Sequence, residues 1–197
     1  MGPLPGAHGG LPPDSFMGGT WSGPVPAWCV PCAGRTMGAM THDRTYQATL
    51  ATEADTDALA AKLAPLLEPG DVVLLSGDLG AGKTRFVQGV ARALGVAGEV
   101  SSPTFNILLT YDDGRLPLNH FDLYRLDAPE ELEDVGYWEA LEGDGASFVE
   151  WGEKFPSEAP DDYLDVHIAV DPAGVRTLTA TAQGGPRSVR LLSDWLA

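Results

Sequence analysis

The stretch Gly77-Asp78-Leu79-Gly80-Ala81-Gly82-Lys83-Thr84 matches the Walker A pattern G-x-x-x-x-G-K-[ST] at every fixed position. Glycines in such a loop let successive backbone N–H groups turn inward around phosphate oxygens, and the following helix adds the positive end of its dipole. The pattern lets Lys83 reach the β- and γ-phosphates and lets the Thr84 hydroxyl bind Mg²⁺. The residues predicted to bind a nucleoside triphosphate are therefore Asp78, Leu79, Gly80, Ala81, Gly82, Lys83 and Thr84.

The sequence on either side of this loop predicts a strand before it and a helix after it. Residues 71–76 form a continuous apolar run of strand length that follows the turn pair Pro69-Gly70. After the loop, apolar side chains recur at helical spacing up to Leu94, and Gly95 is suited to end the helix. The alternative, an ordinary Gly-rich turn, does not explain why strand, loop and helix follow in the order that phosphate binding needs.

Composition and charge limit the classes of partner. The chain has 197 residues and a net charge of −16, and its Lys and Arg residues form no cluster. Because proteins bind nucleic acids mainly by neutralising phosphates, direct binding of DNA or RNA is disfavoured and a basic protein partner is favoured. The sequence has no apolar run long enough to cross a membrane and no secretory leader, which predicts a cytoplasmic protein.

The N-terminal part of the chain differs from the rest. Residues 1–39 are rich in Gly and Pro and poor in charge, a composition that cannot bury a core. We predict a disordered extension over residues 1–39 and a P-loop domain over residues 40–197, with a start of translation at Met37 or Met40 as a further hypothesis. Cys29-Val30-Pro31-Cys32 could be a redox pair or half of a zinc site, but no second ligand pair lies nearby, so an incidental pair is favoured.

Hydrophobic periodicity outlines the rest of the domain. Alternating apolar residues predict strands, and capping patterns predict helices. The predicted strands cover residues 46–50, 71–76, 105–111, 116–122, 146–149, 164–170 and 175–182. The predicted helices follow Thr52, the P-loop and Asp127, the last of these running to about Leu141, with a short closing helix near residues 189–195. This mixture predicts an α/β three-layer sandwich with a mixed sheet, similar to the P-loop NTPases.

Two acidic residues are candidates for metal binding and catalysis. Asp122 ends His120-Phe121-Asp122, and Glu150 ends Phe148-Val149-Glu150. Because strand ends meet the phosphate loop at the carboxyl edge of such a sheet, we predict that Asp122 holds Mg²⁺ in the Walker B role. Glu150 either completes the metal shell or orients the attacking water. The alternative for each acid is a solvated side chain at a strand end.

Two further residues lie near these acids in the predicted fold. Thr104, in Ser102-Pro103-Thr104, lies on a loop where a hydroxyl could sense the γ-phosphate as switch residues do, and a simple turn residue is the alternative. Trp151 follows Glu150 directly, and core packing explains it as well as a functional contact does. The predicted catalytic residues are Asp122, Glu150, Thr104 and Trp151. The predicted metal ligands are Thr84, Asp122 and Glu150.

Five blocks of sequence together resemble one family. They are residues 77–84, Gln88-Gly89, Ser102-Pro103-Thr104-Phe105, the run His-Phe-Asp-Leu-Tyr-Arg-Leu at 120–126, and Val149-Glu150-Trp151. In this order the chain resembles the bacterial TsaE (YjeE) ATPases, a component of the synthesis of threonylcarbamoyladenosine (t⁶A) in tRNA. The H-x-D-L-Y-R run and the E-W pair are more specific than the Walker A pattern.

The resemblance implies functions for these residues. It covers about residues 45–170 and implies that the domain over residues 40–197 is an ATPase with ATP and Mg²⁺ as cofactors, in which Asp122 and Glu150 serve the metal and hydrolysis. Thr104 and Trp151 would belong to switch segments, and Thr52 would lie near the adenine.

The resemblance also implies partners. TsaE proteins dock on the TsaB–TsaD heterodimer, and TsaD transfers the threonylcarbamoyl group, so tRNA would be contacted only through the complex. No contact with DNA or a membrane is implied. The chain departs from the family in two places: Arg85 stands where a small hydroxyl residue is usual, and Gly152 stands where Pro is usual.

Three other functions are open from the residues alone. A small-molecule kinase usually carries an Arg-rich lid, whereas the arginines here are scattered. A GTPase needs a guanine-reading N-K-x-D segment, but neither Asn106 nor Asn119 precedes a lysine, and the D-x-x-G of residues 171–174 lies in a late turn. A binding scaffold with a vestigial loop is disfavoured because the loop and both acids are all present.

Overall fold

The computed structural model describes residues 2, 45–195 and 197. Apart from Gly2, the predictions for the N-terminal extension, for Cys29 and Cys32, and for a start at Met37 or Met40 lie outside these residues. The strands are β1 (Thr45–Leu50), β2 (Val72–Ser76), β3 (Leu108–Tyr111), β4 (Leu118–Asp122), β5 (Ala146–Glu150), β6 (Tyr163–Val170) and β7 (Arg176–Gln183). The helices are α1 (Glu53–Leu63), α2 (Lys83–Leu94), α3 (Glu131–Asp134), α4 (Tyr137–Glu142) and α5 (Pro186–Trp195), with 3₁₀ turns η1 (Ala64–Leu66), η2 (Leu123–Arg125), η3 (Gly152–Lys154) and η4 (Pro156–Glu158).

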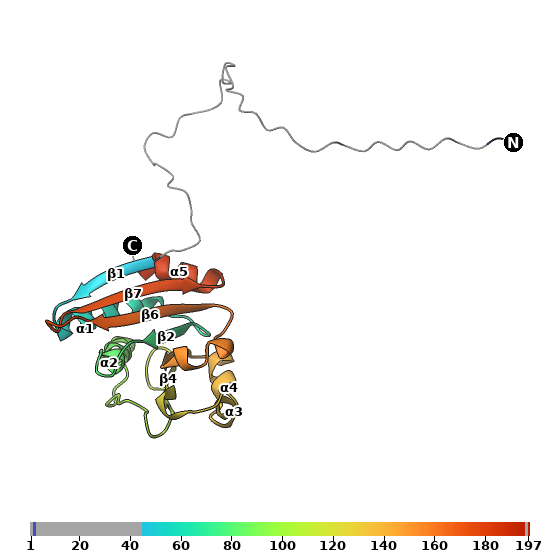
Figure 1. Cartoon of the computed structure of the whole chain (residues 1–197), viewed down its shortest axis with the longest axis horizontal. Coiled ribbons are helices and arrows are strands. Elements are labelled where there is room, and N and C mark those ends of the chain that lie inside the picture. Colours follow the sequence, from blue (N-terminus) through green and yellow to red (C-terminus); the bar gives the residue numbers. More distant parts are fainter. Residues whose placement is uncertain (1, 3–44, 196) are drawn as a thin grey trace, which may run out of the picture. The chain divides into compact units, whose positions relative to one another are not determined.

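The strands form one sheet in the order β1-β7-β6-β2-β5-β4-β3 (Figure 1). Strand β2 pairs in parallel with β5 and β6, and β4 pairs in parallel with β5. The pairs β1–β7, β6–β7 and β3–β4 are antiparallel. Because β2, β4, β5 and β6 all run in one direction, their carboxyl ends share one edge of the sheet. This is the edge at which β2 leads through the P-loop into α2.

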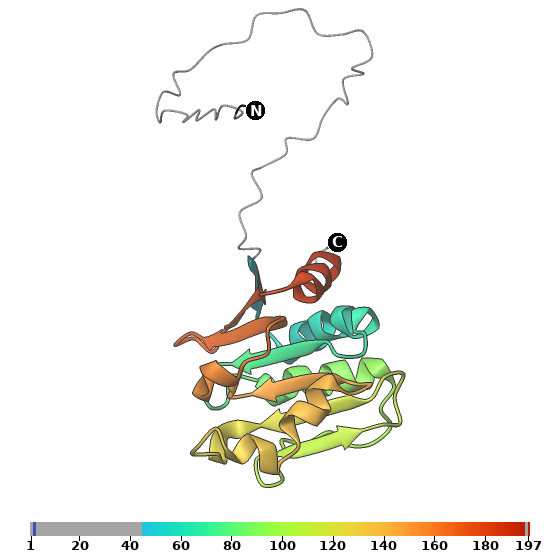
Figure 2. The ribbon, with the colours of Figure 1, turned by 90° about the vertical axis from the view of Figure 1, so that its right-hand side faces the viewer.

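Helices cover both faces of the sheet. Alternation along β2 sends Val73 and Leu75 into the core beneath α1, α2 and α5, and sends Val72 and Leu74 into the core beneath α3 and α4. In Figure 1, α2 lies to the left of the central strands and α3 and α4 lie to the right, and Figure 2 views α3 and α4 from the front. The predicted α/β three-layer sandwich with a mixed sheet is confirmed. No helix of the described residues is long and apolar enough to cross a bilayer.

The hairpin before the first acid is shorter than the sequence predicted. Strand β3 begins at Leu108, because the carbonyl of Pro103 accepts hydrogen bonds from the amides of Asn106 (2.9 Å) and Ile107 (2.6 Å) and closes a tight turn. Ile107 has a φ of 64°, which no strand residue adopts. The prediction of a strand over residues 105–107 is therefore wrong. The turn instead carries the chain back to the end of β4.

The single helix predicted over residues 127–141 is also wrong. The chain forms the short helices α3 and α4, separated at Gly136, whose φ of 68° places it in the left-handed region. Asp127 does not cap a helix with its side chain. Its amide and that of Ala128 donate to the carboxylate of Glu131 instead, each at 2.8 Å. The left-handed glycine explains why one helical pattern became two helices.

Candidate active site

The backbone path of residues 77–82 requires its glycines. Gly77, Gly80 and Gly82 have φ values of 134°, 81° and 108°, in the region that favours glycine. At Gly77 a Cβ atom would also collide with the carbonyl oxygen of Ile168 on β6. The loop thus turns tightly out of β2 and reaches the N-terminus of α2, where backbone amides point outward and favour an anion.

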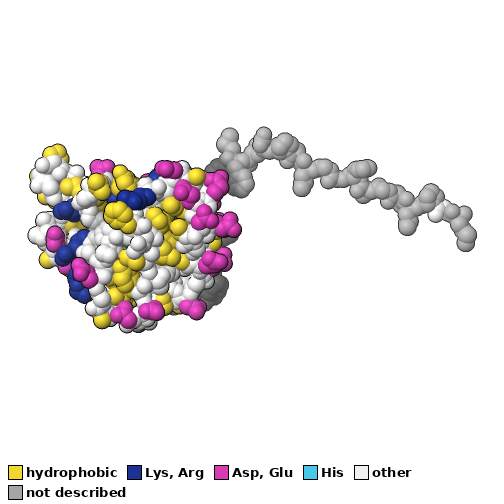
Figure 3. Space-filling model, turned by 90° about the horizontal axis from the view of Figure 1, so that it is seen from below, with side chains coloured by type: hydrophobic (Ala, Val, Ile, Leu, Met, Phe, Trp, Pro, Cys, Tyr) yellow, Lys and Arg dark blue, Asp and Glu magenta, His cyan; other side chains and the backbone are white. Residues whose placement is uncertain are grey.

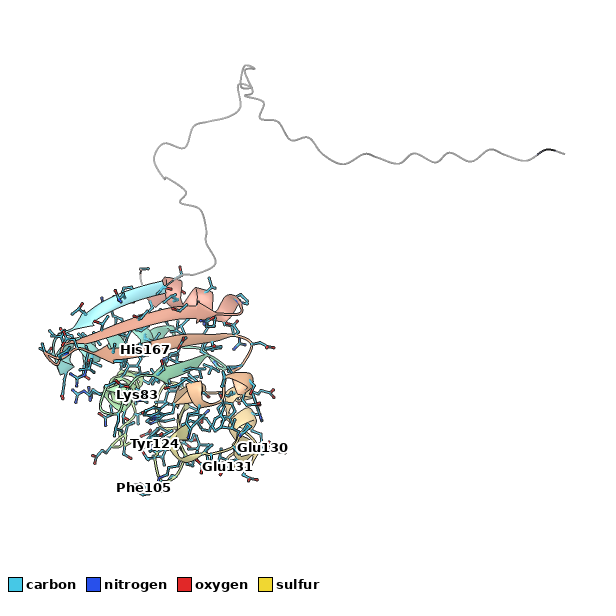
Figure 4. All side chains as sticks on the ribbon, in the orientation of Figure 1. Lys83, Phe105, Tyr124, Glu130, Glu131 and His167 are labelled. Atoms are coloured by element: carbon cyan, nitrogen blue, oxygen red, sulfur yellow. The ribbon has the colours of Figure 1, made fainter. Side chains whose placement is uncertain are left out.

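Lys83 lies at the start of α2 (Figure 4), and its hydrogen bond to Gly77 turns its ammonium group toward the loop. The residue is only 4% exposed, and Nζ donates to the carbonyls of Gly77 (2.7 Å) and Asp78 (3.1 Å). Nζ also lies 4.0 Å from the centre of the Trp151 ring, within the range of a cation–π contact. The positive charge is therefore held at the place where an anion in the loop would meet it.

Glu150 ends β5 and contacts the start of α2. It is 3% exposed and is in register with Leu75 of β2, close to the loop. Its Oε1 accepts a hydrogen bond from Oγ1 of Thr84 (2.7 Å) and lies 2.9 Å from Nε2 of His120. The structure thus brings Thr84 and Glu150, two of the predicted metal ligands, into direct contact.

Asp122 ends β4 and is in register with Glu150 of β5. Its Oδ2 accepts hydrogen bonds from the hydroxyls of Thr104 (2.6 Å) and Ser102 (2.9 Å), and its Oδ1 accepts one from the amide of Tyr124 (3.1 Å). Asp122 therefore fixes the segment before β3 through the hydroxyl groups of Ser102 and Thr104. Both acids and the Thr104 hydroxyl lie at the same edge of the sheet as the phosphate loop.

Trp151 lies between the phosphate loop and the core beneath α3 and α4. Its backbone has a φ of 64°, a strained value for a bulky residue. Its ring contacts the Lys83 ammonium on one side and lies 5.2 Å from the ring of Tyr124. It also packs against the core beneath α3 and α4. Core packing and a contact with the loop lysine, the two explanations that the sequence allowed for Trp151, therefore each describe part of its surroundings. Close by, burial raises the pKa of the Glu153 carboxyl, and the Lys83 charge only partly offsets the rise.

Thr52 is not part of this group of contacts. Its hydroxyl and amide pair with the Asp55 carboxylate in the capping box that opens α1, as the sequence predicted for the helix start. Arg85, which follows the Walker A motif, forms ion pairs with Asp57 (2.7 Å) and Glu53 (3.2 Å) on α1. The Arg85 side chain thus forms a bridge between α2 and α1.

The sequence alone assigned no function to three residues of the site, Ser102, His120 and Arg176. The spacing between His120 and Asp122 is the signal that could have found the histidine, because residues two apart on a strand face the same side. Ser102 lies two residues before Thr104 and shares its acceptor. Arg176 donates Nε to the carbonyl of Ala81 (2.9 Å) from β7. It has no local signal, because only the pairing of β6 with β7 brings it to the loop.

Fold and site together define an α/β protein of the P-loop NTPase type, in which a glycine-rich loop and two buried acids share one sheet edge. The sequence pattern of the family described as threonylcarbamoyl adenosine biosynthesis protein TsaE matches residues 50–178. The chain belongs to the TsaE family, which confirms the resemblance seen in the sequence blocks.

Individual relatives agree with this assignment. The chain is 43% identical over 130 residues to the tRNA threonylcarbamoyladenosine biosynthesis protein TsaE of Bacillus subtilis, covering 66% of this chain and 81% of that protein. It is 46% identical over 114 residues to the protein of the same name from Treponema pallidum, covering 58% and 84%. The crystal structure of Bacillus subtilis YdiB superposes with a TM-score of 0.67 at 33% identity, covering 78% of this chain and 95% of that one.

Proposed function

We propose that the chain is a Mg²⁺-dependent ATPase of the t⁶A modification machinery, with residues 40–197 as its ATPase domain. The observation that carries the proposal is the hydrogen bond from Thr84 in the loop to Glu150 at the end of β5, with Asp122 in register beside Glu150. A loop that only bound phosphate would have no use for two buried acids at its edge, because each acid costs free energy to desolvate. The names of the relatives support a place in t⁶A synthesis.

The chain offers the groups that ATP and Mg²⁺ require. The amides of residues 78–84 would bind the phosphates, and Lys83 would exchange its loop carbonyls for phosphate oxygens. Thr84 and Glu150 would hold Mg²⁺, since their oxygens are hard ligands already in contact. The described residues contain no group of three or more His, Cys, Asp or Glu that could hold a metal ion, so phosphate and water oxygens would complete the shell. When bound, Mg²⁺ neutralises charge on the phosphates.

The two acids divide the remaining roles. Both oxygens of Asp122 accept hydrogen bonds from neighbouring groups, so we assign Asp122 to the outer shell, where it holds the Thr104 hydroxyl toward the γ-phosphate. Glu150 lies at the loop and would orient the attacking water as well as the metal. Trp151 follows Glu150 and contacts the loop lysine, so a movement of this segment would displace Glu150 and change the contact with Lys83.

We also propose that the ATPase works as a nucleotide-driven partner of the TsaB–TsaD heterodimer in the cytoplasm. The net charge of −16 favours a basic protein surface as the docking site. Lys and Arg side chains on the face in Figure 3 form small separate groups, and acidic side chains lie along much of its margin. Such a face does not favour direct binding of tRNA, because RNA binding needs a continuous basic surface. Contact with tRNA would therefore pass through the complex.

The proposal is tested by binding and turnover together. Lys83→Ala should abolish ATP binding measured by calorimetry, whereas Lys62→Ala, which changes an exposed lysine of α1, should leave it unchanged. Phosphate release should be slow for the isolated chain and should rise when TsaB–TsaD is added. Wild-type affinity in the Lys83→Ala protein would contradict the site, and full turnover without partners would contradict the dependence on a complex. Transfer of phosphate to an acceptor other than water would favour the kinase alternative.

A further inference from the structure

His120 is a buried residue that the ATPase proposal does not yet use. It is 0% exposed on β4 and faces the same side of the strand as Asp122. Its Nε2 lies 2.9 Å from Oε1 of Glu150, while its Nδ1 is buried and has no hydrogen-bond partner among the described residues. A buried polar atom without a partner costs about 1–3 kcal/mol. An apolar residue would avoid that cost, so the contact with Glu150 is the feature that distinguishes histidine here.

The contact with Glu150 identifies which ring atom of His120 acts as the donor. For Nε2 to donate to a carboxylate oxygen, Nε2 must carry the hydrogen. Nε2 lies 2.9 Å from Oε1 of Glu150, which is within hydrogen-bond distance.

The two oxygens of Glu150 differ in their surroundings. Oε1 accepts from both Thr84 (2.7 Å) and His120 (2.9 Å). Oε2 accepts no hydrogen bond from the described residues, and it is not among their fully enclosed polar atoms without a partner. Oε1 is thus held by two hydrogen bonds, whereas Oε2 lies on the accessible side of the carboxylate. Two donors from different elements, α2 and β4, fix its orientation.

We propose that His120, through its Nε2–H, is a positioning residue that holds Glu150 in the orientation needed to bind Mg²⁺. The inference rests on the proposed function, because it needs Thr84 and Glu150 to hold the metal. Thr84 would turn an oxygen lone pair to the ion, whereas the Nε2–H of His120 is committed to Glu150 alone. Loss of a group that orients a metal ligand typically costs about 10- to 100-fold in metal affinity or activity.

The test compares His120→Leu with His120→Gln. The glutamine amide can place an N–H donor where Nε2 lies, and leucine cannot. We expect His120→Leu to weaken Mn²⁺ binding about 10- to 100-fold in protein saturated with a non-hydrolysable ATP analogue, followed by electron paramagnetic resonance. His120→Gln should stay within about threefold of the wild type. Affinity for the analogue in EDTA should be the same in all three proteins, because His120 does not contact the loop.

A second readout needs no metal. In ¹⁵N-histidine spectra of the metal-free protein, the ring signal that is absent from His120→Gln should show a hydrogen on Nε2. If His120→Leu does not fold, His120→Asn takes its place, since the shorter amide does not reach Oε1.

The outcomes separate the inference from the ATPase proposal. Wild-type Mn²⁺ affinity in the Leu variant, or the Asn variant in its place, would overturn the role of His120 and leave the ATPase proposal standing. Equal weakening in the Leu and Gln proteins would also overturn it, because only the imidazole shape would then matter. A ring whose Nε2 carries no hydrogen would contradict its part as the donor to Glu150. Absence of Mn²⁺ binding in the wild type would overturn both proposals.

Discussion

Thr84→Val removes the hydroxyl that joins the phosphate loop to Glu150 and keeps the β-branched shape of the side chain. The bond is 2.7 Å long and Glu150 is 3% exposed, so the substitution takes one of two donors from a buried carboxylate. Valine and threonine have similar helix propensity, so α2 itself changes little. Because a hydrogen bond to a charged group contributes about 1.5–3 kcal/mol, we expect the free energy of unfolding to fall by about 2 kcal/mol. Urea unfolding of the nucleotide-free protein measures the change.

The same substitution should remove the effect of Mg²⁺ on nucleotide binding. We expect the wild type to bind an ATP analogue more tightly with Mg²⁺ than with EDTA, and the Val variant to bind it equally in both. Thr84→Ser keeps the hydroxyl and is the matched control that should restore stability and the Mg²⁺ effect. If the Val variant kept both wild-type values, the contact between Thr84 and Glu150 would have no part in the site.

Three further predictions follow from single contacts. Asp122→Asn should fold normally and lower ATP turnover by about a hundredfold or more, and phosphate release near the wild-type rate would exclude Asp122 from the mechanism. Trp151→Gly should be more stable than Trp151→Ala by about 1 kcal/mol in urea unfolding, because glycine tolerates the φ of 64°, and the opposite ranking would contradict that backbone geometry. Burial raises the pKa of the Asp162 carboxyl, but hydrogen bonds from Ser188 and Arg187 outweigh it and hold the pKa below its ordinary value. The wild type should therefore exceed Asp162→Asn in stability at neutral pH and lose that advantage as the pH falls below about 4, whereas parallel pH profiles would contradict the contact.

Local sequence signals were sufficient where neighbours in the chain decide the structure. The strand, loop and helix around residues 77–84 are consecutive, so the pattern fixed their order, and the structure has them as β2, the loop and α2. The sequence predicted that Asp122 and Glu150 lie at strand ends near the loop, and the parallel pairing of β4 with β5 places them at one edge. The capping box at Thr52 is likewise a contact over three residues.

Nonlocal contacts explain what the sequence could not show. Phe105 fits the alternation of a strand, but its side chain is 80% exposed and lies against the Arg125 guanidinium, 4.1 Å from the ring centre. Nothing in the alternation shows that the chain turns at Pro103 before the strand begins. The bond from Arg176 to the loop joins residues 95 positions apart, so it exists only once the sheet has formed.

The contacts of Lys83 bear on the affinity of the proposed site for a nucleotide. Lys83 is 4% exposed, and its ammonium group contacts two loop carbonyls and the Trp151 ring, so a triphosphate would compete with them for the same charge. The cation–π contact alone contributes about 0.5–2 kcal/mol, which lowers apparent affinity roughly two- to thirtyfold if it must be broken. Trp151 is held in a strained backbone conformation, and a movement of this residue would release that strain. A partner that moved this segment would therefore raise nucleotide affinity without touching the loop, which would join the proposed ATPase chemistry to the proposed assembly through one residue.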